Sequence, residues 1–266
     1  MPTLTQSQTP KKNKTKIKTE VPQRLSDSPV LNINFETDFL PNNTSGTLPY
    51  SLFIPLHYEP RYAYPLLVWL HPSGEDERQL MKIMPQISLR NYVAAAPQGM
   101  LLDESAGKNT SERTVLSMMH RTKKNYGWLN DAGSLDEIEG KVFDCITLAQ
   151  ERCSIAAHKI FLAGFGSGGE SSLRLAMMYP ERFAGAALFG GVVPDDFRLF
   201  PLWQKNQPLN ILLGIGQSVD AAACRSIETL HAAGAAVEIA EYPDINSATA
   251  EMLRDLNRWM MNIVAA

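Results

Sequence analysis

Residues 159–180 read KIFLAGFGSGGESSLRLAMMYP, and this stretch decides the fold. An apolar run typical of a buried strand, residues 160–163, meets a cluster of glycines, and a helical pattern follows at once. A strand, a sharp turn and a helix in this order form the elbow in which the pattern G-x-S-x-G lifts a serine to the top of a sheet. Here Gly166 holds the central position of that pattern, and Ser167 stands one residue later.

Ser167 has two interpretations. A register shifted to Ser167 would put Phe165 at the position of the first glycine, which is sterically poor because helix and strand approach closely there. Ser167 and Glu170 have the spacing of a capping box, S-x-x-E, which predicts that Ser167 caps the following helix. The alternative is a reactive or ligand-contacting hydroxyl. Glycine at 166 would also relieve an elbow strain of about 1–3 kcal/mol.

Length and composition limit the class of protein. The chain has 266 residues, which suits one large domain or two small ones, and with 44% hydrophobic residues it can bury a sizeable core. The net charge of −3 argues against a nucleic-acid-binding protein as a whole. No apolar run reaches the length of a membrane span, and no secretory signal is visible. The three cysteines form no metal pattern and suit reduced thiols, so we expect a cytoplasmic protein.

Residues 1–30 differ in composition from the rest of the chain. They are rich in Thr, Gln, Lys and Pro, with a cluster of lysines between positions 11 and 18. Such a segment buries too little apolar surface to offset its ordering entropy, so we predict a disordered tail. It would serve as a solubilising tail or contact an anionic partner. Residues 31–266 are then the folded domain.

Strand and helix patterns alternate through that domain. We expect strands at 31–35, 48–55, 66–70, 92–96, 160–163, 184–189, 209–213 and 237–241. We expect helices at 78–84, at 134–153, from 167 onward, at about 220–231 and at 247–263. The first two strands should be antiparallel, with a turn at 42–46 between them. This order predicts an α/β fold with a mainly parallel sheet of about eight strands and helices on both faces. Residues 97–133 form a long irregular insert.

Several stretches resemble an α/β-hydrolase of the carboxylesterase and phospholipase-like group, which includes polyester-depolymerase-like esterases. They are, in order, PLLVWLHPSG (65–74), YGW (126–128), IFLAGFGSGG (160–169), YPERFAG (179–185), the Tyr-Pro pair at 242–243 and MLRDLNRW (252–259). The resemblance covers residues 31–266. It implies a serine, an acid and a histidine in that order along the chain, together with an oxyanion hole.

All three side-chain positions of that triad are altered. Gly166 occupies the nucleophile position, Val219 the usual acid position and Asn246 the usual base position. Asp220 follows the acid position by one residue and can equally cap the next helix. No histidine follows His231, which we expect to be structural. We expect His158 on a surface turn and His57 near the end of a strand.

Two histidines are better placed. His71 belongs to the stretch 65–74, which resembles the strand and oxyanion loop of such hydrolases. His120 belongs to the insert, which we expect to overhang a pocket near Trp128. The backbone N–H groups of Ser167 and of Ser73 or Gly74 could form the oxyanion hole, whereas Pro72 removes one donor.

Three hypotheses remain open. The first is a catalytically silent or impaired hydrolase-fold protein that keeps a pocket for a small acyl, ester or carboxylate ligand, or for a partner protein. The second is an active esterase that uses Ser167 with His71 or His120, with Asp220 as the acid. The third is an interaction scaffold that makes its contact through the Lys-rich tail. The sequence contains no dinucleotide, P-loop or metal signature, so we expect no cofactor and no metal, and it does not indicate an oligomeric state.

Overall fold

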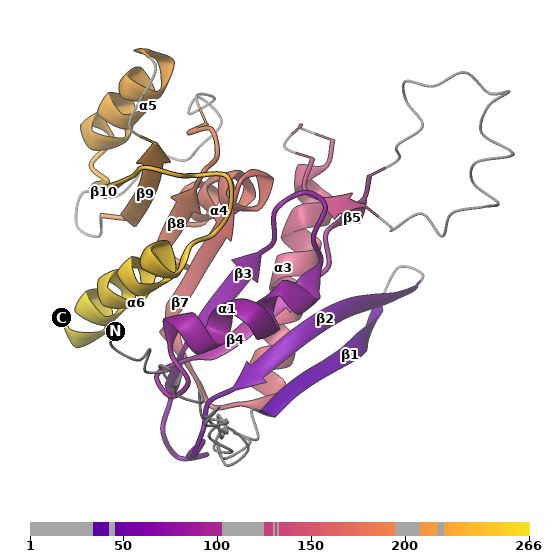
Figure 1. Ribbon diagram of the computed structural model, residues 1–266. Coiled ribbons are helices and arrows are strands. Elements are labelled where there is room, and N and C mark those ends of the chain that lie inside the picture. Colours follow the sequence, from indigo (N-terminus) through magenta and orange to yellow (C-terminus); the bar gives the residue numbers. More distant parts are fainter. Residues whose placement is uncertain are drawn as a thin grey trace, which may run out of the picture. The chain divides into compact units, whose positions relative to one another are not determined.

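The apolar runs of the sequence form an eight-stranded sheet (Figure 1). The computed structural model describes residues 34–42, 46–102, 125–129, 131, 133–194, 208–216 and 221–266, with side chains from Pro49 onward except at 221–222. In spatial order the strands are β1 (Asn34–Asn42), β2 (Gly46–Ile54), β4 (Val93–Pro97), β3 (Tyr64–Leu70), β7 (Ile155–Phe165), β8 (Gly185–Phe189), β9 (Asn210–Gly216) and β10 (Ala236–Tyr242). Strand β2 is antiparallel to β1 and β4, and every other neighbouring pair is parallel. The predicted mainly parallel sheet is confirmed.

Helices cover both faces of the sheet, as the alternation of patterns predicted (Figure 1). One face carries α3 (Leu135–Arg152), α4 (Ser167–Met178) and α5 (Ala221–Ala232), and the other carries α1 (Leu80–Ile87) and α6 (Ala250–Ala265). A short 3-10 helix, η1 (Glu77–Gln79), precedes α1. Ile138, Val142, Ile146 and Ala149 of α3 are buried, and so are Leu253, Leu256 and Met260 of α6. Each face of the sheet therefore has its own apolar core.

The first strand differs from its prediction. Strand β1 runs from Asn34 to Asn42 and pairs with β2 over nine residue pairs, whereas the sequence suggested a strand at 31–35 and a turn from 42 to 46. Strand pairing is made by main-chain hydrogen bonds, which continue through polar positions that show no apolar alternation. The predicted antiparallel arrangement is confirmed.

Two predicted segments lie wholly or partly outside the described residues. The basic tail, residues 1–30, is one of them, and most of the 97–133 insert, including His120, is the other. The described ends of the insert pair with each other, as β5 (Met100–Leu101) and β6 (Tyr126–Gly127). This pairing brings the two ends of the insert close together beside the sheet.

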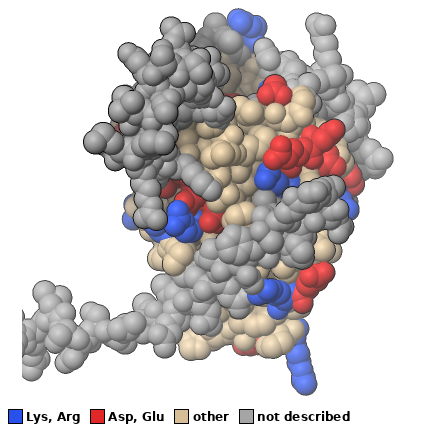
Figure 2. Space-filling view, turned by 90° about the vertical axis from the view of Figure 1, so that its right-hand side faces the viewer, with Lys and Arg blue, Asp and Glu red and all other residues tan. Residues whose placement is uncertain are grey.

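The described surface mixes charges of both signs. Figure 2 shows Lys and Arg side chains lying next to Asp and Glu side chains on the face that it draws. Among the described residues, ion pairs join Lys82 with Glu75 and Arg258 with Asp255. This face therefore carries no extended field of one sign among the residues described. Within the same ranges, no helix combines the length and apolarity that crossing a bilayer requires.

Candidate functional site

The elbow between β7 and α4 has the backbone shape that a nucleophile position requires. Gly166 has φ 56° and ψ −127°, and its N–H donates to the carbonyl oxygen of Phe189 at 2.8 Å. The N-cap of α4 is Gly166, so the capping box predicted at Ser167 is wrong by one residue. Glu170 instead accepts a hydrogen bond from the N–H of Val192 at 2.8 Å. Ser167 is therefore the first residue of the helix.

The three glycines of the elbow are required for different reasons. A Cβ atom at Gly164 would lie 2.6 Å from the carbonyl oxygen of Leu70, and one at Gly168 would also clash with that oxygen. Both positions need glycine because strand and helix touch there. At Gly166 the nearest atom to an added Cβ would be Cβ of Pro72 at 3.9 Å, so the space for a side chain remains. Only the positive φ favours glycine at this position.

The loop after β3 lies beside the elbow because β3 and β7 are neighbouring parallel strands, with Leu70 opposite Gly164. The carboxyl ends of parallel strands meet at one edge of a sheet, and both loops leave from that edge. The loop places Ser73 against the start of α4, where its Oγ lies 3.0 Å from Oγ of Ser167. The hydroxyl nearest the elbow thus contacts a second hydroxyl.

The same loop was expected to supply a backbone donor for an oxyanion. Pro72 has no N–H, and the N–H of Gly74 donates to the carbonyl oxygen of Tyr126 at 2.8 Å. The N–H of Ser73 has no acceptor among the described residues. Of the two residues proposed from the sequence, Ser73 is therefore the one whose backbone N–H is free with respect to the described part of the chain.

His71 is fully buried, and both of its ring nitrogens are engaged. Its Nε2 accepts a hydrogen bond from the N–H of Gly99 at 2.9 Å, and its Nδ1 lies 2.8 Å from the carbonyl oxygen of Pro72. An amide N–H needs an acceptor and a carbonyl needs a donor, so the neutral ring carries its proton on Nδ1. Burial lowers the pKa of His71, although the Pro72 carbonyl, Asp76 and Glu75 act in the opposite direction. The imidazole is held neutral with no free lone pair.

Trp128 completes the environment of this histidine. Its indole is buried, and its Nε1 donates to the carbonyl oxygen of His71 at 2.8 Å. The two ring centroids lie 5.4 Å apart. Trp128 therefore lies against the loop after β3 and helps to fix the backbone of that loop, and its role in a pocket stays a prediction.

The remaining triad positions are only partly described. Asn246 is exposed, and its side-chain amide and its backbone N–H both donate to Oδ1 of Asp244, at 2.7 Å and 2.9 Å. Val219, Asp220 and His120 lie outside the described residues. The assignment of catalytic roles to Asp220 and His120 stays a prediction.

The other histidines occupy peripheral positions. His57 is exposed and has φ 59°, and His158 is exposed on β7. His231 is exposed in the last turn of α5, three residues before Gly234, whose φ is 92°. Cys145 and Cys153 are buried and Cys224 is exposed, and all three are free thiols.

No elbow residue lines either of two cavities within the described part of the chain. One of about 550 Å³ lies between β10 and the end of α6, and one of about 270 Å³ lies near Tyr64 and Arg90. The acyl pocket expected beneath the insert stays a prediction, because most of that insert is not described.

Comparisons with known proteins identify the fold. No model of a known protein family matches the sequence, and no curated protein matches it. Solved structures do match. A carboxylesterase from Mesorhizobium loti is 18% identical with a TM-score of 0.61, and the match covers 85% of this chain and 98% of that one. This chain has the α/β-hydrolase fold.

Two further structures lead to the same result. A Bacillus cereus carboxylesterase is 15% identical with a TM-score of 0.59, over 81% of this chain and 94% of that one. The fluorophosphonate-binding serine hydrolase FphF of Staphylococcus aureus is 14% identical with a TM-score of 0.59, over 87% and 98% of the two chains. The fold implied by the resemblance in sequence is confirmed. At sequence identities this low, the comparisons show the α/β-hydrolase fold and nothing about activity.

Two contacts of the candidate site were not predicted from the sequence. One is the hydroxyl contact of Ser73, which was expected to act only through its backbone. The other is the N–H of Gly99, which occupies the acceptor nitrogen of His71. Strands β3 and β4 are neighbouring parallel strands, so the residues that follow them meet at one edge of the sheet. The positions of His71 and Gly99 just after two predicted strands were therefore the signal from which this contact could have been predicted.

Proposed function

We propose that this protein is a hydrolase-fold protein whose ester-hydrolysing chemistry is impaired or lost, and that its elbow binds a small acyl or carboxylate group. One observation carries the proposal. The nucleophile position holds Gly166, in the backbone conformation of an elbow but without a side chain that could attack a carbonyl. Loss of a triad serine or histidine costs about 10⁶-fold in turnover, and the rest of such a site exceeds water by about 10³–10⁴-fold.

The state of His71 supports the same proposal. A general base needs a free lone pair within hydrogen-bond reach of the proton that it takes. The acceptor nitrogen of His71 is occupied by Gly99, and its other nitrogen faces the carbonyl of Pro72. The hydroxyl of Ser167 contacts that of Ser73. The second candidate function is an active esterase built on Ser167, and because both nitrogens of His71 are engaged, its base would be His120.

The binding part of the proposal rests on hydrogen-bond donors. The N–H of Ser73 has no acceptor among the residues described. The hydroxyls of Ser73 and Ser167 contact each other next to this N–H. Donors of this kind suit a carbonyl or carboxylate oxygen. The three free thiols favour a reducing compartment, and we propose that the protein is cytoplasmic.

Hydrolysis of p-nitrophenyl butyrate tests the proposal. We expect the wild type to turn over at a rate close to the buffer background, and Ser167→Ala and His120→Ala to leave that rate unchanged. His158→Ala, an exposed residue on β7, is the matched control. Turnover well above background that both Ser167→Ala and His120→Ala abolish would overturn the proposal and establish the second candidate.

Binding is tested separately, by ligand-observed NMR with butyrate. We expect Ser73→Ala to weaken butyrate binding and His158→Ala to leave it unchanged. Absence of any butyrate contact with the wild type would remove the binding part of the proposal while leaving the loss of catalysis in place.

A further inference from the structure

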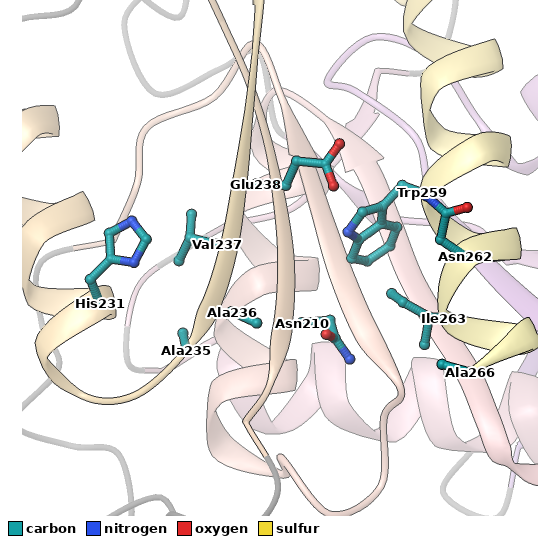
Figure 3. A pocket seen from close by; sticks show the side chains of 10 residues that line it. All are labelled: Asn210, His231, Ala235, Ala236, Val237, Glu238, Trp259, Asn262, Ile263 and Ala266. Carbon is teal, nitrogen blue, oxygen red and sulfur yellow. The ribbon is translucent and has the colours of Figure 1, made fainter.

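The larger of the two cavities described above is lined by residues that lie far from the elbow in the sequence, and Trp259 forms part of its wall. It lies between β10, the last strand of the sheet, and the final turns of α6, with a volume of about 550 Å³ (Figure 3). Ligand cavities in proteins commonly have volumes of about 300–1,000 Å³. Figure 3 shows its lining on both sides of β10, with His231 and Val237 on the α5 side and Glu238 and Trp259 on the α6 side.

Trp259 is held rigidly in the wall of this cavity. Its side chain is only 4% exposed, and its ring packs against the ring of Phe161 with centroids 5.8 Å apart. A Cβ atom at Gly185 would lie 2.7 Å from Cη2 of Trp259, so the glycine makes room for the outer edge of the indole. The ring therefore has a fixed place, and its nitrogen has a fixed direction.

The indole N–H of Trp259 has no partner within the described part of the chain. No described residue accepts a hydrogen bond from it, and the nitrogen is not among the atoms sealed from solvent. Figure 3 shows the five-membered ring turned toward β10 and the cavity. A buried indole usually finds an acceptor, so an open N–H in a cavity wall is a position for an acceptor oxygen of a ligand.

Two polar side chains on this side of β10, Asn210 and Glu238, offer acceptor oxygens, and the amide of Asn262 can both donate and accept. The amide nitrogen of Asn210 donates to the carbonyl oxygen of Ala184 at 2.9 Å, which leaves its own oxygen free to accept. The carboxylate of Glu238 makes no ion pair with any described residue. None of the residues that line the cavity is a Lys or an Arg. The charge at this site therefore favours a cation over an anion.

We propose that this cavity binds small amino amides, organic molecules that combine an ammonium group, a carbonyl oxygen and an apolar chain. The carbonyl oxygen accepts from the N–H of Trp259. The ammonium group donates to the carboxylate of Glu238 and to the side-chain oxygen of Asn210. The apolar chain packs on Ala236 and Ile263, which also line the cavity. This site is independent of the elbow and of the function proposed for it.

Titration of the ¹⁵N-labelled full chain with L-leucinamide tests the proposal by NMR. The indole N–H signal of Trp259 is assigned by its absence from Trp259→Phe, which retains a ring in the same packing position. We expect leucinamide to shift this signal along a saturating curve. 4-Methylpentanamide, which has the same chain and amide but no ammonium group, should not shift it.

Two variants on the same strand sharpen the result. Glu238→Gln should weaken leucinamide binding about fivefold, which is the value of one partly exposed ion pair. Glu241→Gln, an exposed residue whose side chain points to the other face of β10, should leave the affinity unchanged. The proposal is overturned if leucinamide does not shift the Trp259 signal, if the uncharged amide shifts it equally, or if Glu238→Gln binds as the wild type does.

Discussion

Oγ of Ser73 and Oγ of Ser167 lie 3.0 Å apart, and this contact joins the loop after β3 to the first residue of α4. It gives the hydroxyl beside the elbow another hydroxyl as a partner. A hydroxyl can orient Ser167 but cannot remove its proton at neutral pH, because it is not a base. Under the proposed function, the contact belongs to a site that binds an oxygen atom and does not attack a carbonyl.

A double-mutant cycle on unfolding measures this contact. Ser73→Ala and Ser167→Ala should each lower the free energy of unfolding by no more than about 1 kcal/mol, with a coupling of about 0.5–1 kcal/mol, because the pair is exposed to water. Urea denaturation of the wild type, both single variants and the double variant gives the value. A coupling of zero would mean that the two hydroxyls do not interact in solution.

Gly166→Ala should destabilise the protein by about 1–2 kcal/mol, because a φ of 56° is unfavourable for a residue with a Cβ. The added methyl group has room, so the effect isolates backbone strain. The matched control is Gly140→Ala in α3, where an added Cβ meets nothing within 4 Å. This control should stabilise the helix by about 0.5–1 kcal/mol. Thermal or urea unfolding that ranks the two variants in the opposite order would contradict the positive φ at the elbow.

His71 should make stability depend on pH. The pKa of His71 is lowered because burial disfavours the charged ring, so the unfolded chain binds its proton more readily than the folded chain does. The contribution of neutral His71 to the free energy of unfolding is fully present above the ordinary histidine pKa of about 6.5. It is lost as the pH falls below that value, by at most about 1.4 kcal/mol per pH unit. Urea denaturation between pH 7.5 and pH 5 measures the slope.

His71→Gln should flatten that slope, whereas His158→Gln, which changes an exposed residue, should not alter it. An unchanged slope in His71→Gln would show that the buried ring is not the group that titrates.

The three thiols should react at different rates. Cys145 and Cys153 are buried and Cys224 is exposed, and burial raises the pKa of the Cys145 thiol further. In native buffer, DTNB should therefore modify one thiol promptly, and guanidinium should release all three. Cys224→Ser should remove the fast phase. A fast phase that survives in this variant would contradict the buried positions of the other two thiols.

The sequence predicted much of the fold because the strands of a parallel sheet are buried on both faces and read as continuous apolar runs. Leu66 to Leu70 and Ile160 to Ala163 are such runs, and both became strands at the centre of the sheet. Strand β1 was placed less well, because its pairing with β2 passes through positions that have no apolar pattern.

The candidate site was predictable in position but not in its contacts. The glycines around Gly166 located the elbow in the sequence. The start of α4 depends on the positive φ of Gly166, which the residue types of a capping box do not predict. The bonding of His71 depends on Gly99, which belongs to another strand and meets it only after the sheet forms. Such contacts between distant residues are set by strand register, which a single sequence does not display.

The central claim is that the elbow of this protein lacks a reactive serine. Its most direct test is the intact mass of the full chain after incubation with a fluorophosphonate probe, with an active serine esterase treated in parallel as a positive control. We predict that the mass of this protein remains unmodified while the control is labelled completely. A stoichiometric adduct that peptide mapping places on Ser167, and that Ser167→Ala abolishes, would contradict the account.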